Sequence, residues 1–310
     1  MFKVFIDGSA GTTGLKIYDR LSSRKDIELI VLDDSVRKDI GARKNAINSS
    51  DITFLCLPDD AARESVSLIE NDKTIVIDTS TAHRVNEDFT YGFAEINNLR
   101  EKLKRAKKIS NPGCHASGFI SLINPLVNAG VLKNLDKLTA YSLTGYTGGG
   151  KKMIAEYEGD NRPIAFDSPR LYGLTQSHKH LPEMVKYSSI ECAPVFMPIV
   201  CDYACGMQVT VPLFKSDLTC SVSDLKDIYK SHYVDKVVRY DDNSENGFLA
   251  SNTLSGRDDM LISVYGNDDR ITLVSRFDNL GKGASGAAVQ NMNIALGLDE
   301  TLSLNLGESI

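Results

Sequence analysis

Residues 2–14, FKVFIDGSAGTTG, decide the fold of the chain. An apolar run typical of a β-strand leads directly into a glycine-rich turn, and apolar residues then recur at helical spacing from Leu15 to Leu21. In such a unit the glycines let the backbone approach a pyrophosphate, which rests on the helix N-terminus. The spacing G-x-x-G-x-x-G differs by one residue from the common dinucleotide pattern, but its place after the first strand favours a phosphate-binding turn over an ordinary tight turn.

The first third of the chain repeats this strand–helix alternation. Further strand-like runs occupy residues 27–32, 52–57 and 74–78, and helical segments separate them. Such alternation is typical of a parallel sheet with helices on both faces, which binds ligands at the carboxyl ends of its strands. We therefore expect an α/β, Rossmann-type, doubly wound domain over residues 1–113, completed by a C-terminal helix over residues 284–310.

The pattern changes after residue 114. Longer runs at residues 138–143, 207–213, 260–265 and 270–275 partly alternate polar with apolar side chains. This alternation predicts a mixed, largely antiparallel sheet with one packed face. The sequence thus predicts a second, α+β domain over residues 114–283.

Composition excludes several classes of function. The chain has 310 residues, enough for two domains, and a net charge of −6 without a basic cluster. Binding to nucleic acid or to an anionic membrane is therefore not expected. The chain has neither an apolar run of membrane-spanning length nor a signal-type N-terminus, and its six cysteines lack disulfide or zinc-site spacing. We expect a cytoplasmic protein with reduced thiols and no metal.

The local sequence of one cysteine favours a reactive thiol. In residues 111–118, NPGCHASG, Cys114 follows a Pro-Gly break and precedes an apolar helical run. Backbone N–H groups at a helix N-terminus favour a thiolate and lower the pKa of the thiol. A buried structural cysteine is an equally good local interpretation. His115 adjoins this cysteine, but neighbouring residues point apart, so we discount it as the partner.

A histidine-containing loop supplies the expected base. Residues 176–184 hold two of only five histidines. His178 and His180 share a side if the segment is extended, and Glu183 at the following helix start can orient an imidazole. The alternative is a pair of exposed structural histidines.

Other residues are suited to binding anions or a ring. An acid at the end of the second strand, Asp33 or Asp34, is typical of ribose recognition in NAD enzymes. The polar and basic residues that follow, Ser35, Arg37 and Lys38, suit the 2′-phosphate of NADP instead. The local sequence leaves the choice between the two cofactors open.

Three later stretches carry similar signals. Arg84 follows a strand end and can hold a phosphate or carboxylate, although a surface arginine is the alternative. A glycine loop at residues 145–150 leads into Lys151, which suits an anion or a flexible connector. The small residues of 278–291 either pack against another helix or leave room for a flat ring.

Together these elements resemble the shorter form of the N-acetyl-γ-glutamyl-phosphate reductases over essentially the full chain. The Asn-Pro-Gly-Cys of residues 111–114 and the His-x-His-x-Pro-Glu of residues 178–183 are specific to that family. The glycine triplet and the Lys-Gly-Ala-Ser-Gly of residues 282–286 are shared with aspartate-semialdehyde dehydrogenases. The chain departs from the longer forms by a compact middle with three glycines at residues 148–150.

The resemblance implies NADPH-dependent reduction of N-acetyl-L-glutamyl 5-phosphate to N-acetyl-L-glutamate 5-semialdehyde and phosphate, within arginine biosynthesis. It implies a thioester on Cys114 and proton transfer by His178, since the base of the family matches the first histidine. It also implies a homo-oligomer, a dimer or tetramer, assembled through the sheet of the second domain.

The expected site residues fall into three groups. The catalytic residues are Cys114, His178 and Glu183. Substrate or phosphate is expected to bind at Ser80, Arg84, Asn111, Lys151 and His180. The cofactor, NADP(H), is expected to bind at Gly8, Ser9, Gly11, Thr12, Thr13, Gly14, Ser35, Arg37, Gly283 and Ala284.

Three other functions compete with this one. An aspartate-semialdehyde dehydrogenase is less favoured, because its nucleophile motif usually lacks the Pro-Gly. A non-catalytic NADP-binding redox sensor would bind the cofactor without turnover. A cysteine hydrolase would leave the glycine-rich turn unexplained.

Overall fold

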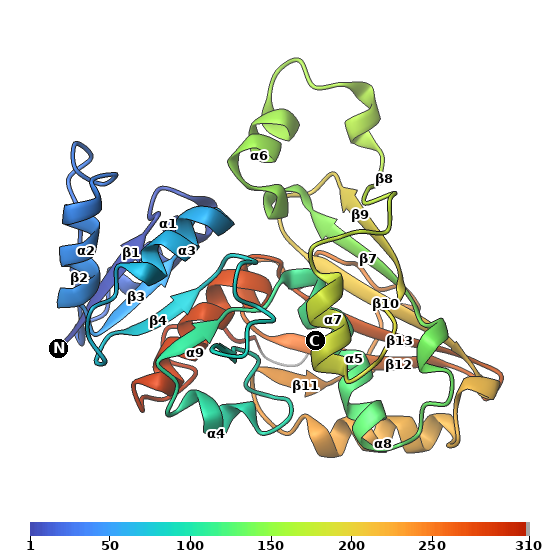
Figure 1. Ribbon diagram of the computed structural model, residues 1–310. Helices are drawn as coiled ribbons and strands as arrows, with labels where there is room; N and C mark the ends of the chain where they lie inside the picture. The colour runs from blue at the N-terminus through green and yellow to red at the C-terminus, as the bar shows by residue number, and fades with distance from the viewer. Residues whose placement is uncertain (308–310) are drawn as a thin grey trace. The chain divides into compact units, whose positions relative to one another are not determined.

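The computed structural model describes residues 1–307, which form two compact units (Figure 1). The first unit comprises Met1–Pro112 and Ala284–Leu304. The second comprises Gly113–Gly283 together with the residues that follow Leu304. Among the described residues, no helix is long and apolar enough to cross a membrane.

The first unit is built on a sheet of six strands that are all parallel, in the order β2-β1-β3-β4-β6-β5. The strands are β1 (Phe2–Asp7), β2 (Ile27–Ile30), β3 (Ile52–Leu55), β4 (Ile75–Asp78), β5 (Thr90–Tyr91) and β6 (Lys108–Ser110). The helices are α1 (Thr12–Leu21), α2 (Ile40–Ser49), α3 (Asp59–Ser67), α4 (Leu99–Leu103) and α9 (Gly286–Ala295). The predicted Rossmann-type parallel sheet is therefore confirmed.

Helices cover both faces of this sheet. Neighbouring residues of a strand point to opposite sides, so each face presents apolar side chains that a helix can bury. Val4 of β1 packs in one core with Ile17 of α1 and Met292 of α9. The adjacent Phe5 packs on the other face with Ile47 of α2. Buried strands of this kind need no polar alternation, which explains the continuous apolar runs of the sequence.

The helix expected over residues 284–310 is shorter than that range and begins at Gly286. It ends at Ala295, and Gly297 takes a left-handed φ of +70°, a conformation that commonly terminates a helix. The chain then forms turns, and Asn305 bonds through its backbone N–H to Asp258 of the second unit at 2.8 Å. Residues 308–310 lie outside the described residues.

The second unit contains a seven-stranded sheet in the order β11-β12-β13-β10-β7-β9-β8. Its strands are β7 (Thr139–Gly145), β8 (Arg170–Leu171), β9 (Val195–Cys201), β10 (Met207–Phe214), β11 (Val238–Tyr240), β12 (Met260–Gly266) and β13 (Arg270–Phe277). The pairs β7–β9 and β11–β12 are parallel and the other four are antiparallel, which confirms the predicted mixed sheet.

Four α-helices accompany this sheet: α5 (Cys114–Asn128), α6 (Gly150–Glu158), α7 (Leu181–Ser188) and α8 (Val222–His232). Short 3₁₀ segments occupy Leu135–Lys137, Tyr146–Gly149, Ile164–Asp167 and Lys215–Asp217, and a π-helical turn spans Gly281–Ser285. One face of the sheet leaves apolar side chains exposed. Tyr141, Val195 and Phe214 lie on it, and Tyr141 is opposite Met197 and Thr210 on the adjoining strands.

Helix α5 is the central helix of the second unit. It packs against α7, α8, β10 and β13. Gly118 permits this approach, because a Cβ at that position would lie 2.3 Å from Cγ2 of Val209. Pro125 neither ends the helix nor leaves a carbonyl unpaired: the Tyr233 hydroxyl donates to the carbonyl of Ser121, four residues before the proline, at 2.8 Å.

Candidate functional site

The glycine-rich turn of the first unit is so compact that its backbone leaves no room for side chains at Gly8 and Gly14. Gly8 has a φ of +87°, and a Cβ there would lie 2.3 Å from the carbonyl oxygen of Cys56. A Cβ on Gly14 would lie 2.5 Å from the Gly8 oxygen, and the N–H of Gly11 donates to that same oxygen at 2.9 Å. Thr12 begins α1, and its Oγ1 is buried without a hydrogen-bond partner. A turn with free helix N–H groups and an unpaired hydroxyl fits a phosphate ligand.

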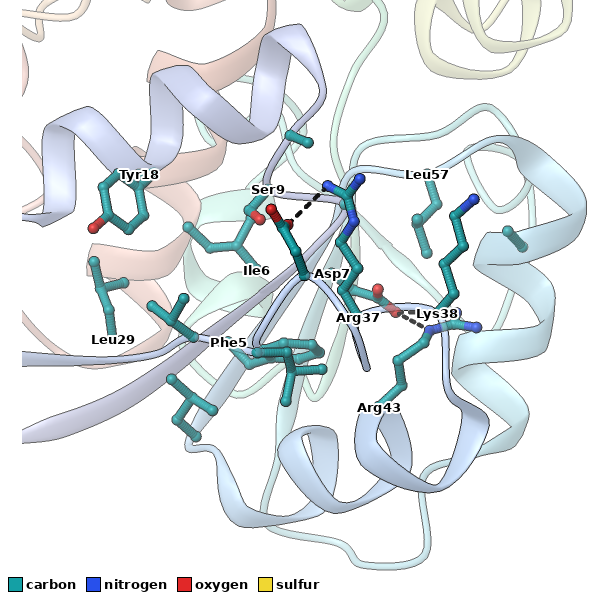
Figure 2. Close-up of a pocket in the computed structure, with 17 residues that line it drawn as sticks. Phe5, Ile6, Asp7, Ser9, Tyr18, Leu29, Arg37, Lys38, Arg43 and Leu57 are labelled. Carbon is teal, nitrogen blue, oxygen red and sulfur yellow. Dashed lines mark hydrogen bonds and ion pairs between the residues drawn. The ribbon is translucent and has the colours of Figure 1, made fainter.

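A cavity of about 500 Å³ adjoins this turn (Figure 2). Figure 2 shows Tyr18 and Leu29 at one end and three basic residues, Arg37, Lys38 and Arg43, at the other. An apolar end suits a base and a cationic end suits a phosphate. This cavity fits the adenosine part of a nicotinamide dinucleotide, with a phosphate at its basic end.

Some of the predicted cofactor residues line this cavity and others do not. Gly8, Ser9 and Arg37 line it. Ser35 is not among the lining residues, and its hydroxyl instead donates to Asp33 at 2.7 Å.

Arg43 is a lining residue that sequence reasoning missed. Its Nη2 and Nε donate to Asp7 at 3.1 and 3.2 Å, and its Nη1 donates to Glu64 at 2.7 Å. Ser65 also donates to the Asp7 carboxylate, at 2.8 Å. Because Asp7 directly precedes Gly8, this buried network fixes the entrance to the turn. No motif marks Arg43, since its partners lie far apart in sequence.

Three predicted substrate residues lie at the carboxyl ends of strands in the first unit. Arg84 is buried, and it donates to the carbonyls of Asn111 and Thr79 at 3.0 and 3.1 Å. The Asn111 amide donates to the carbonyl of Ala284 at 3.0 Å. Ser80 donates to Asp78 at 2.8 Å. Arg84, Asn111 and Ala284 are thus brought together.

Lys151 belongs to the second unit. It is in the first turn of α6, and its side chain is exposed.

In the second unit, Cys114 is the first residue of α5, with Gly113 as the N-cap. Because Gly113 has no side chain, it does not cap the N–H groups of the first helical turn. Glu183, on α7, is almost fully buried, and its Oε2 accepts from the N–H of Gly113 at 3.0 Å. This carboxylate therefore holds the backbone directly before the cysteine, a contact that the sequence did not suggest.

The two predicted histidines lie against each other. The ring centroids of His178 and His180 are 4.7 Å apart, and Nδ1 of His178 accepts from the N–H of His180 at 3.2 Å. Neutral His178 consequently carries its proton on Nε2. His180 is only 5% exposed, which contradicts the alternative of two exposed histidines.

His115, which sequence reasoning discounted, belongs to the same cluster. Its ring lies 5.4 Å from that of His178 and 5.5 Å from that of His180. Burial lowers its pKa to about 3, with smaller contributions from His178 and Lys179, so the ring is neutral near pH 7. A histidine in an otherwise apolar helix start was the available signal.

The small-residue segment also reaches the cysteine. A Cβ on Gly283 would lie 2.9 Å from the Cβ of Cys114. Gly283 belongs to the π-helical turn, a form found frequently at functional sites. In the second unit, Gly283 thus lies against Cys114, and Glu183 holds the residue before it. His178 and His180 lie against the ring of His115, the residue that follows Cys114.

Comparison with known proteins identifies the family of the chain. Residues 3–106 match the family model of the semialdehyde dehydrogenase NAD-binding domain, and residues 114–279 match that of the semialdehyde dehydrogenase dimerisation domain. Among solved structures, aspartate semialdehyde dehydrogenase II of Vibrio cholerae, complexed with ASA, has a TM-score of 0.74 at 16% identity, covering 96% of this chain and 98% of that one. This likeness shows the fold.

Curated relatives are closer in sequence. The N-acetyl-gamma-glutamyl-phosphate reductase of Sinorhizobium medicae (strain WSM419) is 44% identical over 305 residues, which cover 95% of this chain and 98% of the relative. N-acetyl-gamma-glutamyl-phosphate reductase 2 of Nostoc sp. (strain PCC 7120) is 42% identical over 318 residues, covering 97% and 99%. The chain therefore belongs to the N-acetyl-gamma-glutamyl-phosphate reductases, within the semialdehyde dehydrogenase family.

Proposed function

We propose that the chain reduces N-acetyl-L-glutamyl 5-phosphate with NADPH to N-acetyl-L-glutamate 5-semialdehyde and phosphate, as a step of arginine biosynthesis. The observation that carries the proposal is the position of Cys114 at the start of a buried helix, in the same unit as two adjoining histidines. The relatives at 42–44% identity support this substrate over aspartyl phosphate, because the likeness to aspartate-semialdehyde dehydrogenases concerns the fold.

The thiolate of Cys114 attacks the carbonyl carbon of the acyl phosphate. Backbone N–H groups at the start of α5 hold the oxyanion that forms, and phosphate leaves as the thioester is made. NADPH, when bound, supplies the hydride that reduces this thioester. The Nε2–H of His178 gives its proton to the oxyanion left by hydride addition and takes it back as the thiohemiacetal collapses to the aldehyde and the Cys114 thiolate. Glu183 keeps the N–H of Gly113, and hence the helix start, in place.

The cofactor would be held by the first unit and the small-residue segment. The glycine-rich turn with Ser9, Thr12 and Thr13 binds the pyrophosphate, and Arg37 with Lys38 binds the 2′-phosphate. Gly283 and Ala284 leave room for the nicotinamide ring. Arg84 and Ser80, with Asn111, are proposed to hold the leaving phosphate; Lys151 and His180 are proposed to contact the substrate.

We further propose a homo-oligomer, a dimer or tetramer, that uses the exposed face of the seven-stranded sheet. The match of residues 114–279 to a dimerisation-domain model supports this, as do the exposed apolar side chains of Tyr141, Val195 and Phe214. All six cysteines are free, which supports the reducing cytoplasm as its location.

The test compares two substrates and two cysteine variants. The chain should reduce N-acetylglutamyl phosphate with NADPH, and a preference for aspartyl phosphate would contradict the proposal. Cys114→Ser should abolish turnover and retain NADPH binding, whereas Cys192→Ser, a change at an exposed cysteine, should alter neither. Binding of NADPH without turnover in the unaltered chain would instead favour a redox sensor.

A further inference from the structure

The ring of His115 links two hydroxyl groups. Its Nδ1 lies 2.6 Å from the Oγ of Ser142 on β7, and its Nε2 lies 2.7 Å from the hydroxyl of Tyr172, just after β8. The ring itself is 3% exposed and follows Cys114 directly in the chain. Three side chains from separate elements thus form one buried hydrogen-bonded row: Ser142, His115 and Tyr172.

A neutral imidazole has one N–H donor and one acceptor nitrogen, so the row runs in one of two directions. In the first, Ser142 donates to Nδ1 and the Nε2–H donates to the Tyr172 oxygen, which leaves the Tyr172 proton for another partner. In the second, Tyr172 donates to Nε2, and only its lone pairs face outward.

The charge on Cys114 selects between these directions. Burial raises the pKa of Tyr172, and the neighbouring Cys114 raises it further, so this tyrosine keeps its proton beside a thiolate. Outward-facing lone pairs would repel the thiolate, whereas an O–H would stabilise it. The first direction is therefore favoured whenever the cysteine is ionised.

We propose that His115 is a positioning residue: it receives a hydrogen bond from Ser142 and orients the Tyr172 hydroxyl so that this hydroxyl donates to the Cys114 thiolate. The inference rests on the proposed role of Cys114 as nucleophile and adds a residue that acts on it only through Tyr172. A protonated His115 could not accept from Ser142, so the row requires the neutral ring.

Other charged and titratable groups also face this row. His178 and Lys179 lower the pKa of His115, and the ring of His180 contacts that of His115. Glu183 accepts from the N–H of the residue before the cysteine. The test must therefore separate the effect of the row from theirs, which it does by leaving all four in place.

The experiment measures the alkylation rate of Cys114 by iodoacetamide, followed on the Cys114 peptide by mass spectrometry between pH 5 and 10, without substrate or cofactor. His115→Phe and Tyr172→Phe should each slow alkylation at pH 7 by about 10-fold, because a hydrogen bond to a charged group is lost. The double variant should be no slower than the slower single variant, and His115→Gln, which keeps a donor, should recover part of the rate.

The matched control is Tyr229→Phe. This change also removes a buried tyrosine hydroxyl, one that donates to the Leu122 carbonyl at 2.5 Å on the same helix α5. It should leave alkylation within about two-fold. If His115→Phe does not fold, Ser142→Ala provides the second test: it removes the first donor of the row and should slow alkylation in the same direction.

Alkylation at unchanged rates, or rates no slower than in Tyr229→Phe, would overturn the inference, as would additive losses in the double variant. The outcome for the proposed function is read separately. If Cys114→Ser retained turnover, the proposed function would fail; if it abolished turnover while His115→Phe alkylated normally, only the role of His115 would fail.

Discussion

Replacing Gly118 with alanine tests how closely α5 must approach the sheet of the second unit. The new Cβ would lie 2.3 Å from Cγ2 of Val209 and 3.0 Å from Cε1 of Phe277, where ordinary contact begins near 3.4 Å. Neither neighbour is a flexible chain end, so the helix or β10 has to move. Overpacking of this kind costs about 1–3 kcal/mol, which lowers the melting temperature of a unit this size by about 3–10 °C.

The same shift should reach the site, because Cys114 lies one helical turn before Gly118 on α5. A displacement of about 1 Å at a nucleophile can reduce turnover by about 100-fold, so kcat should fall while the KM for NADPH changes little. The assays are thermal unfolding by circular dichroism and steady-state kinetics.

The matched control is Gly41→Ala in α2, where the new Cβ meets only the Asp39 carboxylate at 3.2 Å. Alanine is the better helix former by about 1 kcal/mol, so this variant should be as stable as the unaltered chain or more so. Adding Val209→Ala to Gly118→Ala should restore part of the lost stability. Equal melting temperatures for Gly118→Ala and Gly41→Ala would refute the packing argument.

Three further predictions concern the cofactor site and pH. Arg37→Ala should raise the KM for NADPH about 10-fold and leave kcat unchanged, because it removes one charged hydrogen bond to the 2′-phosphate at an exposed position. The control, Arg63→Ala, should change neither constant. Thr12→Val should stabilise the unbound protein against urea by about 1 kcal/mol, since its buried Oγ1 lacks a partner, yet weaken NADPH binding; loss of stability would contradict this. The pKa of His115 is about 3 in the folded chain and 6.5 for an ordinary histidine. Between these pH values the unfolded chain binds one more proton than the folded chain. The free energy of unfolding therefore falls as the pH drops from 6.5 towards 3. His115→Phe should therefore lessen the pH dependence of urea unfolding between pH 4.5 and 6.5, by up to about 1.4 kcal/mol per pH unit, and an unchanged slope would count against neutral burial.

Local patterns were sufficient for much of the fold. The apolar runs of the first unit predicted its parallel strands, because a strand buried on both faces needs no alternation. The Pro-Gly break before Cys114 predicted a helix start there, and the structure begins α5 at that residue. The two-residue spacing of His178 and His180 predicted a shared side only for an extended segment. Their ring centroids lie 4.7 Å apart, but the segment forms a turn in which the N–H of Leu181 donates to the His178 carbonyl.

Features that depend on distant segments could not be predicted in this way. The surroundings of His115 come from elsewhere in the chain, because the segment from Tyr172 to His180 packs against its ring. The continuation of α5 past Pro125 depends on the hydroxyl of Tyr233, more than a hundred residues later. Arg43 acquires its role only when Asp7 and Ser65 fold around it.

The return of the chain from the second unit to α9 has a consequence for synthesis on the ribosome. Ala288, Val289 and Met292 belong to the same core as Val4 and Ile17. That core is therefore incomplete until α9 has emerged, after the whole second unit has been translated. The nascent first unit must keep an apolar sheet face uncovered during this interval, when chaperone binding competes with aggregation.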